Sequence, residues 1–316
     1  MLKVFLRPAM IFIPFLLGIC FPQAHVLNQA PFHLVKWFLC TMVFMACLQL
    51  DFKQLRPRKE HITILLLNLA MGIIPYFLLK FAIPAQPVYA VTAFFVGITP
   101  TATAAPVVVS FLNGRTGFAL TGFTITNLAI AFALVFLLPM VTGNVTFDFI
   151  RNVADTLLRI IVIPFLLAML IRKIFPDARN FPKKCKLFSF SLWSFCLFIL
   201  AAIARNHFIE NPEESVVKVL LIGLISLMIC ICNFTFGRIF SRKKFSRESS
   251  QILGQKNTTL TLYLALHYAG PLVAMGTIFY ILWHNLWNAW QMYAYDKRKW
   301  KRKQPAGDRA KQKDNA

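Results

Sequence analysis

Apolar residues fill ten long segments of the chain, and short polar stretches separate them. Each segment is close to the roughly 20 residues that a helix needs to cross the hydrocarbon core of a bilayer. The segments lie at 4–22, 32–50, 61–83, 88–112, 115–141, 153–175, 187–207, 216–238, 247–268 and 271–294. The pattern predicts an all-α integral membrane protein with ten transmembrane helices and little chain left for an extramembrane domain.

The charge of the chain becomes informative once it is placed on this pattern. Among the 316 residues, 34 are Lys or Arg and 12 are Asp or Glu, which gives a formal net charge of +22. No polar stretch before the tail is long enough to form a nucleic-acid-binding domain, so we expect no nucleic-acid partner. If the N-terminus is cytoplasmic, 27 of the 34 cations fall on the cytoplasmic side, as the positive-inside rule requires. We therefore predict a multi-pass protein of the plasma (inner) membrane with both termini in the cytoplasm.

Basic residues follow the last segment directly. The tail at 296–316 carries nine Lys and Arg, and each cation near an anionic leaflet contributes about 1 kcal/mol of attraction. We expect this basic cytoplasmic tail to bind anionic lipids, and we expect the protein to be a monomer or a homodimer.

Ten spans can form two sets of five. A unit with an odd number of spans, repeated once, enters the membrane in opposite orientations, which is a common plan among secondary transporters. The predicted units are 1–142 and 143–295. The fourth span of each unit contains the most polar stretch within an apolar segment, at 99–106 and at 249–258.

The polar stretch of the first unit contains two prolines. It includes Thr99, Pro100, Thr101, Thr103, Ala105 and Pro106. Proline has no N–H, so we expect the helix to be disturbed at both prolines and to leave carbonyls free in the middle of the bilayer. A broken helix also presents a half-helix N-terminus, whose partial positive charge suits an anion. A kink packed by small residues is the alternative, but the matching stretch in the second unit favours a binding role.

Lys256 is the most unusual residue of the second polar stretch, which also includes Gln251, Gln255, Asn257 and Thr258. It lies about 13 Å along the ninth span at 1.5 Å per residue, unless the boundary is misdrawn by a turn or two. A cation at that depth costs about 2.5 to 3.5 kcal/mol, so it should face a cavity or be paired. Gln251 and Gln255 are four residues apart and share a helix face. With Lys256 and Asn257 alongside, they predict a compact polar surface.

Acidic residues are absent from the interior of the apolar segments, because Asp51, Asp155 and Glu248 lie at span ends. A carboxylate proton relay or sodium ligand is therefore not expected. The spans contain no His-x-x-x-His pair, carboxylate dyad or Ser-His constellation, and no Cys-x-x-Cys pair occurs. We expect no enzyme activity, no cofactor and no metal site.

Four stretches of the chain have a distinctive order and spacing. They are Phe44–Phe52 at the end of the second span, the interrupted fourth span with Phe111-Leu112-Asn113-Gly114, Gly254-Gln255-Lys256-Asn257 with Leu260, and Phe279 with Trp283-His284-Asn285. Together these stretches resemble the bile acid/sodium symporter family. The resemblance covers most of the chain. It implies two inverted five-helix repeats, a panel and a core domain, and fourth and ninth helices that are unwound where they cross. It also implies organic anions as substrates, usually moved with sodium.

The resemblance places the sodium ligands of the family on residues that cannot serve. The glutamate of the family's ninth helix falls on Ile252, and its glutamine falls on Lys256. Further ligands fall on Ala105 and Pro106 and near Ala119 and Phe123. Because hard cations need several oxygen ligands, we hypothesise that the Lys256 ammonium stands in for a bound cation, permanently or as a proton carrier.

The pattern and the resemblance together predict a secondary transporter of a small organic anion, such as a bile-acid-like compound, a steroid sulfate or a carboxylate. Transport is expected to proceed by alternating access around the crossing point, without the family's usual sodium sites. The alternative is a membrane sensor or receptor with a transporter fold and no net transport.

Overall fold

The computed structural model describes residues 13–29, 33–49, 55–212 and 215–303, and its regular structure over these residues is helical. The named helices are η1 (Pro22–Asn28), α2 (Leu34–Leu48), α3 (Lys59–Ala82), α4 (Pro87–Ile98), α5 (Ala104–Phe111), α6 (Thr116–Thr142), α7 (Phe147–Leu157), η3 (Leu158–Val162), α8 (Ile163–Ile174), η4 (Pro176–Asn180), α9 (Phe181–Lys184), α10 (Lys186–Glu210), α11 (Val216–Ile239), α12 (Ser246–Gly254), α13 (Thr258–Tyr268) and α14 (Pro271–Lys303). Residues 4–12 of the predicted first span lie outside the described residues.

Several of these helices are long and apolar enough to cross a membrane. In the described part of the chain, five qualify by length and composition: Lys59–Ala82, Thr116–Thr142, Phe147–Ile174, Leu187–Glu210 and Val216–Ile239. Two shorter apolar helices are Leu34–Leu48 and Pro87–Ile98. The protein is therefore an all-α, integral, multi-pass membrane protein, as the hydrophobic pattern predicted.

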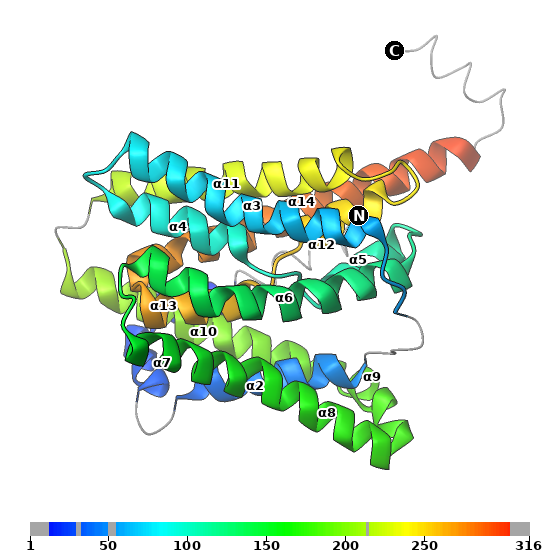
Figure 1. The fold of residues 1–316 in the computed structure, drawn as a ribbon, viewed down its shortest axis with the longest axis horizontal. Helices are drawn as coiled ribbons and strands as arrows, with labels where there is room; N and C mark the ends of the chain where they lie inside the picture. Colours follow the sequence, from blue (N-terminus) through cyan, green and yellow to red (C-terminus); the bar gives the residue numbers. More distant parts are fainter. Residues whose placement is uncertain (1–12, 30–32, 50–54, 213–214, 304–316) are drawn as a thin grey trace, which may run out of the picture.

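The helices form layers that run side by side in Figure 1. Helices α3, α4, α11 and α14 lie along one side of the molecule and pack against one another, whereas α2 packs against α8 and α10 on the other side. Helices α6 and α13 run between them in this view. The largest buried apolar cluster joins residues of α2, α4, α6, α7, α10, α13 and α14, so both sides contribute to one core.

Two predicted spans are each split into two shorter helices. Helix α4 ends at Ile98, because Thr99 precedes Pro100 and takes a polyproline-like backbone (φ −45°, ψ 128°), which proline favours in the preceding residue. The prediction of a second disturbance at Pro106 is wrong. Pro106 lies in the first turn of α5, where a helix has no use for the missing N–H.

The ninth predicted span is split at Gln255–Asn257. Helix α12 continues to Gly254, and Gln255 then takes an extended backbone (ψ 98°). Phe234 of α11 lies so close to Gly254 that an added Cβ would be 2.4 Å from the ring. Glycine is therefore required where the half-helix packs most closely, and the predicted polar stretch at 249–258 spans both a helix end and the break.

Two further differences concern the sixth and last spans. A π-helical turn, Leu158–Val162, ends two residues before Pro164 in the sixth span. Proline cannot donate the hydrogen bond of a regular helix, and the altered turn accommodates it. Helix α14 continues to Lys303, so the last helix extends past 294 into the predicted tail. Residues 304–316 of that tail lie outside the described residues.

Candidate functional site

The two breaks meet in the interior and pair through their backbones. Thr101 and Lys256 form an isolated antiparallel bridge. The N–H of Ala102 donates to the carbonyl of Gln255 (2.8 Å), and the N–H of Asn257 donates to the carbonyl of Pro100 (2.7 Å). Backbone groups freed inside a membrane need partners. Here each break supplies a hydrogen-bond partner for a backbone group of the other, although about 150 residues separate the two breaks along the chain.

Thr101 ties this crossing point to its neighbours. Its hydroxyl donates to the carbonyl of Ile252 (2.7 Å), and the hydroxyl of Thr126 on α6 lies 2.9 Å from it. The side-chain amide of Asn127, also on α6, donates to the carbonyl of Thr101 (2.8 Å). Thr101 is 1% exposed, so it holds three elements together in a dry environment and is not free to contact a ligand.

Lys256 is buried at the crossing point, with 1% of its surface exposed. Its Nζ donates to the carbonyl of Gly97 (3.0 Å), near the C-terminal end of α4, and to Oδ1 of Asn68 on α3. Asn68 is held in turn, because its Nδ2 donates to the carbonyl of Ile98 (3.1 Å). Carbonyls at a helix C-terminus carry partial negative charge. Within the described residues, no carboxylate forms an ion pair with Lys256, so neutral oxygens surround the ammonium.

The two glutamines face a different neighbour. Nε2 of Gln251 donates to Oδ1 of Asn288 (3.1 Å) and contacts Gln291, both on α14. Asn288 donates in turn to Oε1 of Gln255. The compact polar surface predicted for this stretch is formed only in part, because Gln255, Lys256 and Asn257 line one cavity whereas Gln251 does not.

A cavity of about 790 Å³ lies against the crossing point. Its lining from the two breaks consists of Ala102, Thr103, Ala104, Gln255, Lys256, Asn257, Thr258 and Thr259. The opposite wall comes from α2, η3, α8 and α10 and is mainly apolar, with Met42, Phe165 and Trp193 among its residues. Both half-helices that begin at the breaks, α5 and α13, therefore start at the cavity wall.

The predicted site residues divide into two groups. Thr103, Gln255, Lys256, Asn257 and Thr258 line the cavity. The others, which do not line it, are Thr99, Pro100, Thr101, Ala105, Pro106 and Gln251. Thr99, the residue after α4, donates to the carbonyl of Phe95 in that helix (2.6 Å), and Ala105 is fully buried. The second group builds the crossing point and does not form the cavity surface.

Several polar residues of the site were not predicted. Asn68 binds Lys256, and Thr124, Asn127 and His284 line the cavity. His284 is 5% exposed, and its Nδ1 has no hydrogen-bond partner. Asn68 is a single polar residue inside an apolar segment, whereas Thr124 and Asn127 share a stretch with Thr121 and Thr126. His284 is followed directly by Asn285. Polar residues inside apolar spans are the signal that could have identified these positions, because a buried polar group without a partner is costly.

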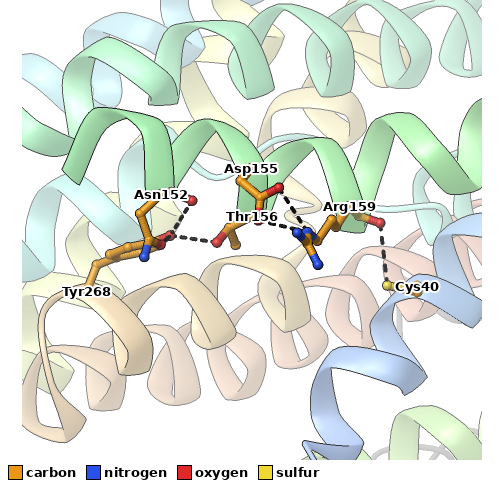
Figure 2. Close-up of polar contacts among 6 residues, drawn as sticks. All are labelled: Cys40, Asn152, Asp155, Thr156, Arg159 and Tyr268. Atoms are coloured by element: carbon orange, nitrogen blue, oxygen red, sulfur yellow. Dashed lines mark hydrogen bonds and ion pairs between the residues drawn. The ribbon is translucent and has the colours of Figure 1, made fainter. Parts of the chain in front are cut away.

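A second polar cluster joins α13 to α7 (Figure 2). The hydroxyl of Tyr268 lies 2.8 Å from Oγ1 of Thr156 and 3.0 Å from Oδ1 of Asn152. One turn further along, Asp155 and Arg159 form an ion pair at 2.7 Å. We call Tyr268, Asn152 and Thr156 the tyrosine clasp. It connects the half-helix behind the cavity to the opposite layer of the molecule.

The molecule is a membrane protein with apolar spans, two broken helices that pair with each other and a cavity beside their crossing point. A profile of the Sodium Bile acid symporter family matches residues 36–211, which is more than half of the chain. The chain therefore belongs to the sodium bile acid symporter family, as its motifs predicted. Members of this family are membrane transporters and not enzymes, in agreement with the expected class. A search of curated proteins gave no match.

Proposed function

We propose that the protein is a secondary transporter of a small organic anion and that it works by alternating access. The observation that carries the proposal is the cavity of about 790 Å³ at the point where the two broken helices pair. Its largely apolar wall suits the hydrocarbon part of a bile-acid-like compound, a steroid sulfate or a carboxylate. We place the protein in the plasma (inner) membrane with both termini in the cytoplasm, because the cations favour that orientation.

The polarity of the cavity favours an anion over a cation. Ala104 and Thr258, the first residues of α5 and α13, line it, and helix N-termini carry partial positive charge. The described residues that line the cavity include no Asp or Glu. His284 adds an unpartnered ring nitrogen. An anionic group would therefore bind near the two half-helix N-termini, with its apolar part against α2 and α10.

Two inverted units, 1–142 and 143–295, account for the order of the helices. In the first unit a long helix, α3, precedes the broken pair α4 and α5, and α6 follows. In the second unit α11, the broken pair α12 and α13, and α14 repeat that order. Helix α3 packs against α4, and α11 packs against α12. These matching pairs support ten spans with a core around the crossing point and a panel that contains α2, α7, α8 and α10.

The Lys256 ammonium takes the place of a coupling cation in this proposal. It is held by oxygens of Asn68 and Gly97, which are ligands of the kind that a hard cation uses. The aligned positions Ile252 and Ala105 are buried and apolar, and they offer no side-chain oxygen. We therefore propose transport that does not require sodium, with Lys256 either a fixed charge or a proton carrier.

Alternating access also needs a barrier on one side of the cavity. The cavity reaches Gln49, the residue after α2, and Leu187 on α10, at the helix ends predicted to be cytoplasmic. The tyrosine clasp lies toward the opposite side of the membrane in the same topology, because it joins the end of α13 to α7, the first helix of the sixth span. The clasp is proposed to close the external side while the cavity opens toward the cytoplasm.

Uptake into proteoliposomes tests the proposed function. We expect uptake of taurocholate, a steroid sulfate or a short carboxylate, with the same rate in sodium and in potassium buffer. Lys256→Gln should reduce that uptake at least about tenfold, because loss of a buried, hydrogen-bonded charge costs more than 1.4 kcal/mol. The control is Lys173→Gln, which removes an exposed cation of α8.

Two results would contradict the proposal in distinguishable ways. A strict sodium requirement would refute the role of Lys256 but leave transport standing. Anion-induced thermal stabilisation without uptake or counterflow would refute transport itself.

A further inference from the structure

A second, basic cavity of about 320 Å³ lies where the α5–α6 turn, the α11–α12 loop and α14 meet. We call it the basic pocket. Its lining consists of Leu112, Asn113, Arg115, Arg238, Lys243, Lys244, Ser246, Arg247, Glu248, Trp290, Gln291, Ala294 and Tyr295. None of these residues lines the cavity at the crossing point. In the predicted topology, the basic pocket lies at the cytoplasmic boundary of the membrane.

Positive charge dominates this lining. Five of the described lining residues are cations, namely Arg115, Arg238, Lys243, Lys244 and Arg247, and Glu248 is the single carboxylate. Glu248 is 4% exposed, and its Oε1 accepts a hydrogen bond from the backbone N–H of Arg115 (2.8 Å). The carboxylate is thus hydrogen-bonded to the backbone of the α5–α6 turn. It cannot neutralise five cations, so the basic pocket keeps a positive potential.

Aromatic rings position part of this charge. The guanidinium of Arg115 lies 5.0 Å from the centre of the Phe245 ring, and that of Arg247 lies 5.3 Å from the centre of the Tyr295 ring. Such stacking orders the charged group and leaves N–H donors available, although Nη1 of Arg247 also donates to the carbonyl of Leu112. Arg238 and Lys243 are exposed, and no carboxylate in the described part of the chain forms an ion pair with either.

We propose that the basic pocket binds a phosphate group, that of an anionic phospholipid headgroup. Arginine forks match phosphate oxygens in geometry and charge, and basic pockets between membrane helices recognise lipid headgroups. The aromatic residues favour a lipid source over a soluble phosphate compound. Trp290, whose surface is 56% exposed, and Tyr295 contribute rings of the kind that lie at headgroup level.

The bound headgroup would connect α12, the residue before α6, and α14, three elements near the crossing point. Arg247 belongs to the first turn of α12, Arg115 precedes α6, and Gln291 belongs to α14. Gln291 also contacts Gln251 of α12. A ligand that bridges these residues favours the arrangement in which α12 packs against α6 and α14, and it should raise the thermal stability of the protein.

The test compares the full chain in nanodiscs of phosphatidylcholine with and without phosphatidylglycerol. Native mass spectrometry counts bound phosphatidylglycerol, and thermal unfolding reports stabilisation. The variant Arg238→Gln/Lys243→Gln should bind phosphatidylglycerol roughly 10- to 30-fold more weakly, because two surface cations are lost. The control Lys173→Gln/Arg179→Gln removes one exposed Lys and one exposed Arg elsewhere and should bind normally. A pocket variant that folds retains the melting temperature of the parent in pure phosphatidylcholine.

Three results would overturn the proposal. An equal melting temperature in nanodiscs with and without phosphatidylglycerol would show that the anionic headgroup is not the ligand. Equal loss in the pocket and control variants would show attraction to the whole basic face and no defined site. Stabilisation by inorganic phosphate or glycerol 3-phosphate without any effect of phosphatidylglycerol would assign the site to a soluble ligand. All readouts measure binding, so they stand whether or not the protein transports an anion.

Discussion

Lys256 and Asn68 form the most consequential contact between single residues. The Lys256 Nζ binds Asn68 Oδ1 and the Gly97 carbonyl, and both side chains are almost fully buried. A buried ammonium has lost its hydration, so its stability in the fold depends on these few oxygens. Removing one acceptor leaves a charge partly uncompensated, whereas removing the charge and the acceptor together leaves an apolar contact.

The first prediction is a double-mutant cycle on this contact. Asn68→Leu should lower the free energy of unfolding by about 3 to 5 kcal/mol, because it strands the buried charge. Lys256→Met should cost less, and Asn68→Leu/Lys256→Met should be clearly more stable than the sum of the single changes. Thermal unfolding in detergent measures all three. The control is Asn206→Leu, which removes an exposed hydrogen bond to Glu210. Additive effects of Asn68→Leu and Lys256→Met would contradict the contact.

The sequence predicted the depth of Lys256 but not its partner. An ammonium nine residues into an apolar segment had to be paired or face a cavity. In the structure, neutral oxygens of Asn68 and Gly97 bind the Lys256 Nζ, and the residue also lines the cavity. The partner Asn68 lies 188 residues away, and a single sequence does not reveal which polar residue of another span will meet it. The same limit applies to Gln251 and Gln255. Their shared helix face was evident, but their binding to Asn288 on α14 depends on how the helices pack.

At the scale of elements, the broken helices and the tyrosine clasp are contacts of different size and role. The backbone pairing of the two breaks fixes the crossing point. The clasp is a smaller contact, because one hydroxyl of α13 meets two polar side chains of α7. Each such hydrogen bond contributes about 0.5 to 1.5 kcal/mol. A contact of that size can break and re-form during a transport cycle.

The second prediction concerns Tyr268→Phe. The change keeps the ring, which packs edge to face on Phe149, but it removes the hydroxyl of the clasp. Loss of about 1 kcal/mol should raise the population open to the external side roughly fivefold. A cysteine placed at cavity residue Thr103, in a cysteine-free chain, reports this opening through its labelling rate with a membrane-impermeant maleimide added outside. Tyr263→Phe on the same helix is the control, and an unchanged rate in Tyr268→Phe would show that the clasp is no barrier.

The breaks themselves were predictable to different degrees. Proline disfavours the helical backbone conformation in the residue before it. Thr99, which precedes Pro100, accordingly takes a polyproline-like backbone, and α4 ends before it. Pro106 has the same chemistry but occupies the first turn of α5, where proline is tolerated. A sequence does not state where a half-helix begins, so the two prolines could not be distinguished. The pairing of the Thr101 and Lys256 backbones also needed the three-dimensional fold.

At the scale of the whole molecule, the distribution of charge and the order of the helices support the same topology. The loop between α3 and α4 contains no cation, whereas the loop between α11 and α12 contains Arg242, Lys243 and Lys244. The two loops occupy the same place in the two proposed units. In an inverted repeat, such equivalent loops must lie on opposite sides of the membrane. The chain is proposed to cross the membrane five times between the two loops, and an odd number of crossings also places them on opposite sides.

The third prediction follows from this equivalence. Single cysteines at Ala85, in the α3–α4 loop, and at Lys243, in the α11–α12 loop, replace residues that are both exposed. In intact cells, a membrane-impermeant maleimide should label Ala85→Cys and spare Lys243→Cys, because positive loops remain in the cytoplasm. Inside-out vesicles should give the reverse pattern. Labelling of both cysteines from the same side would require an even number of crossings between the loops. That result would exclude the inverted arrangement, and with it the proposal that α3–α6 and α11–α14 are oppositely oriented copies of one unit.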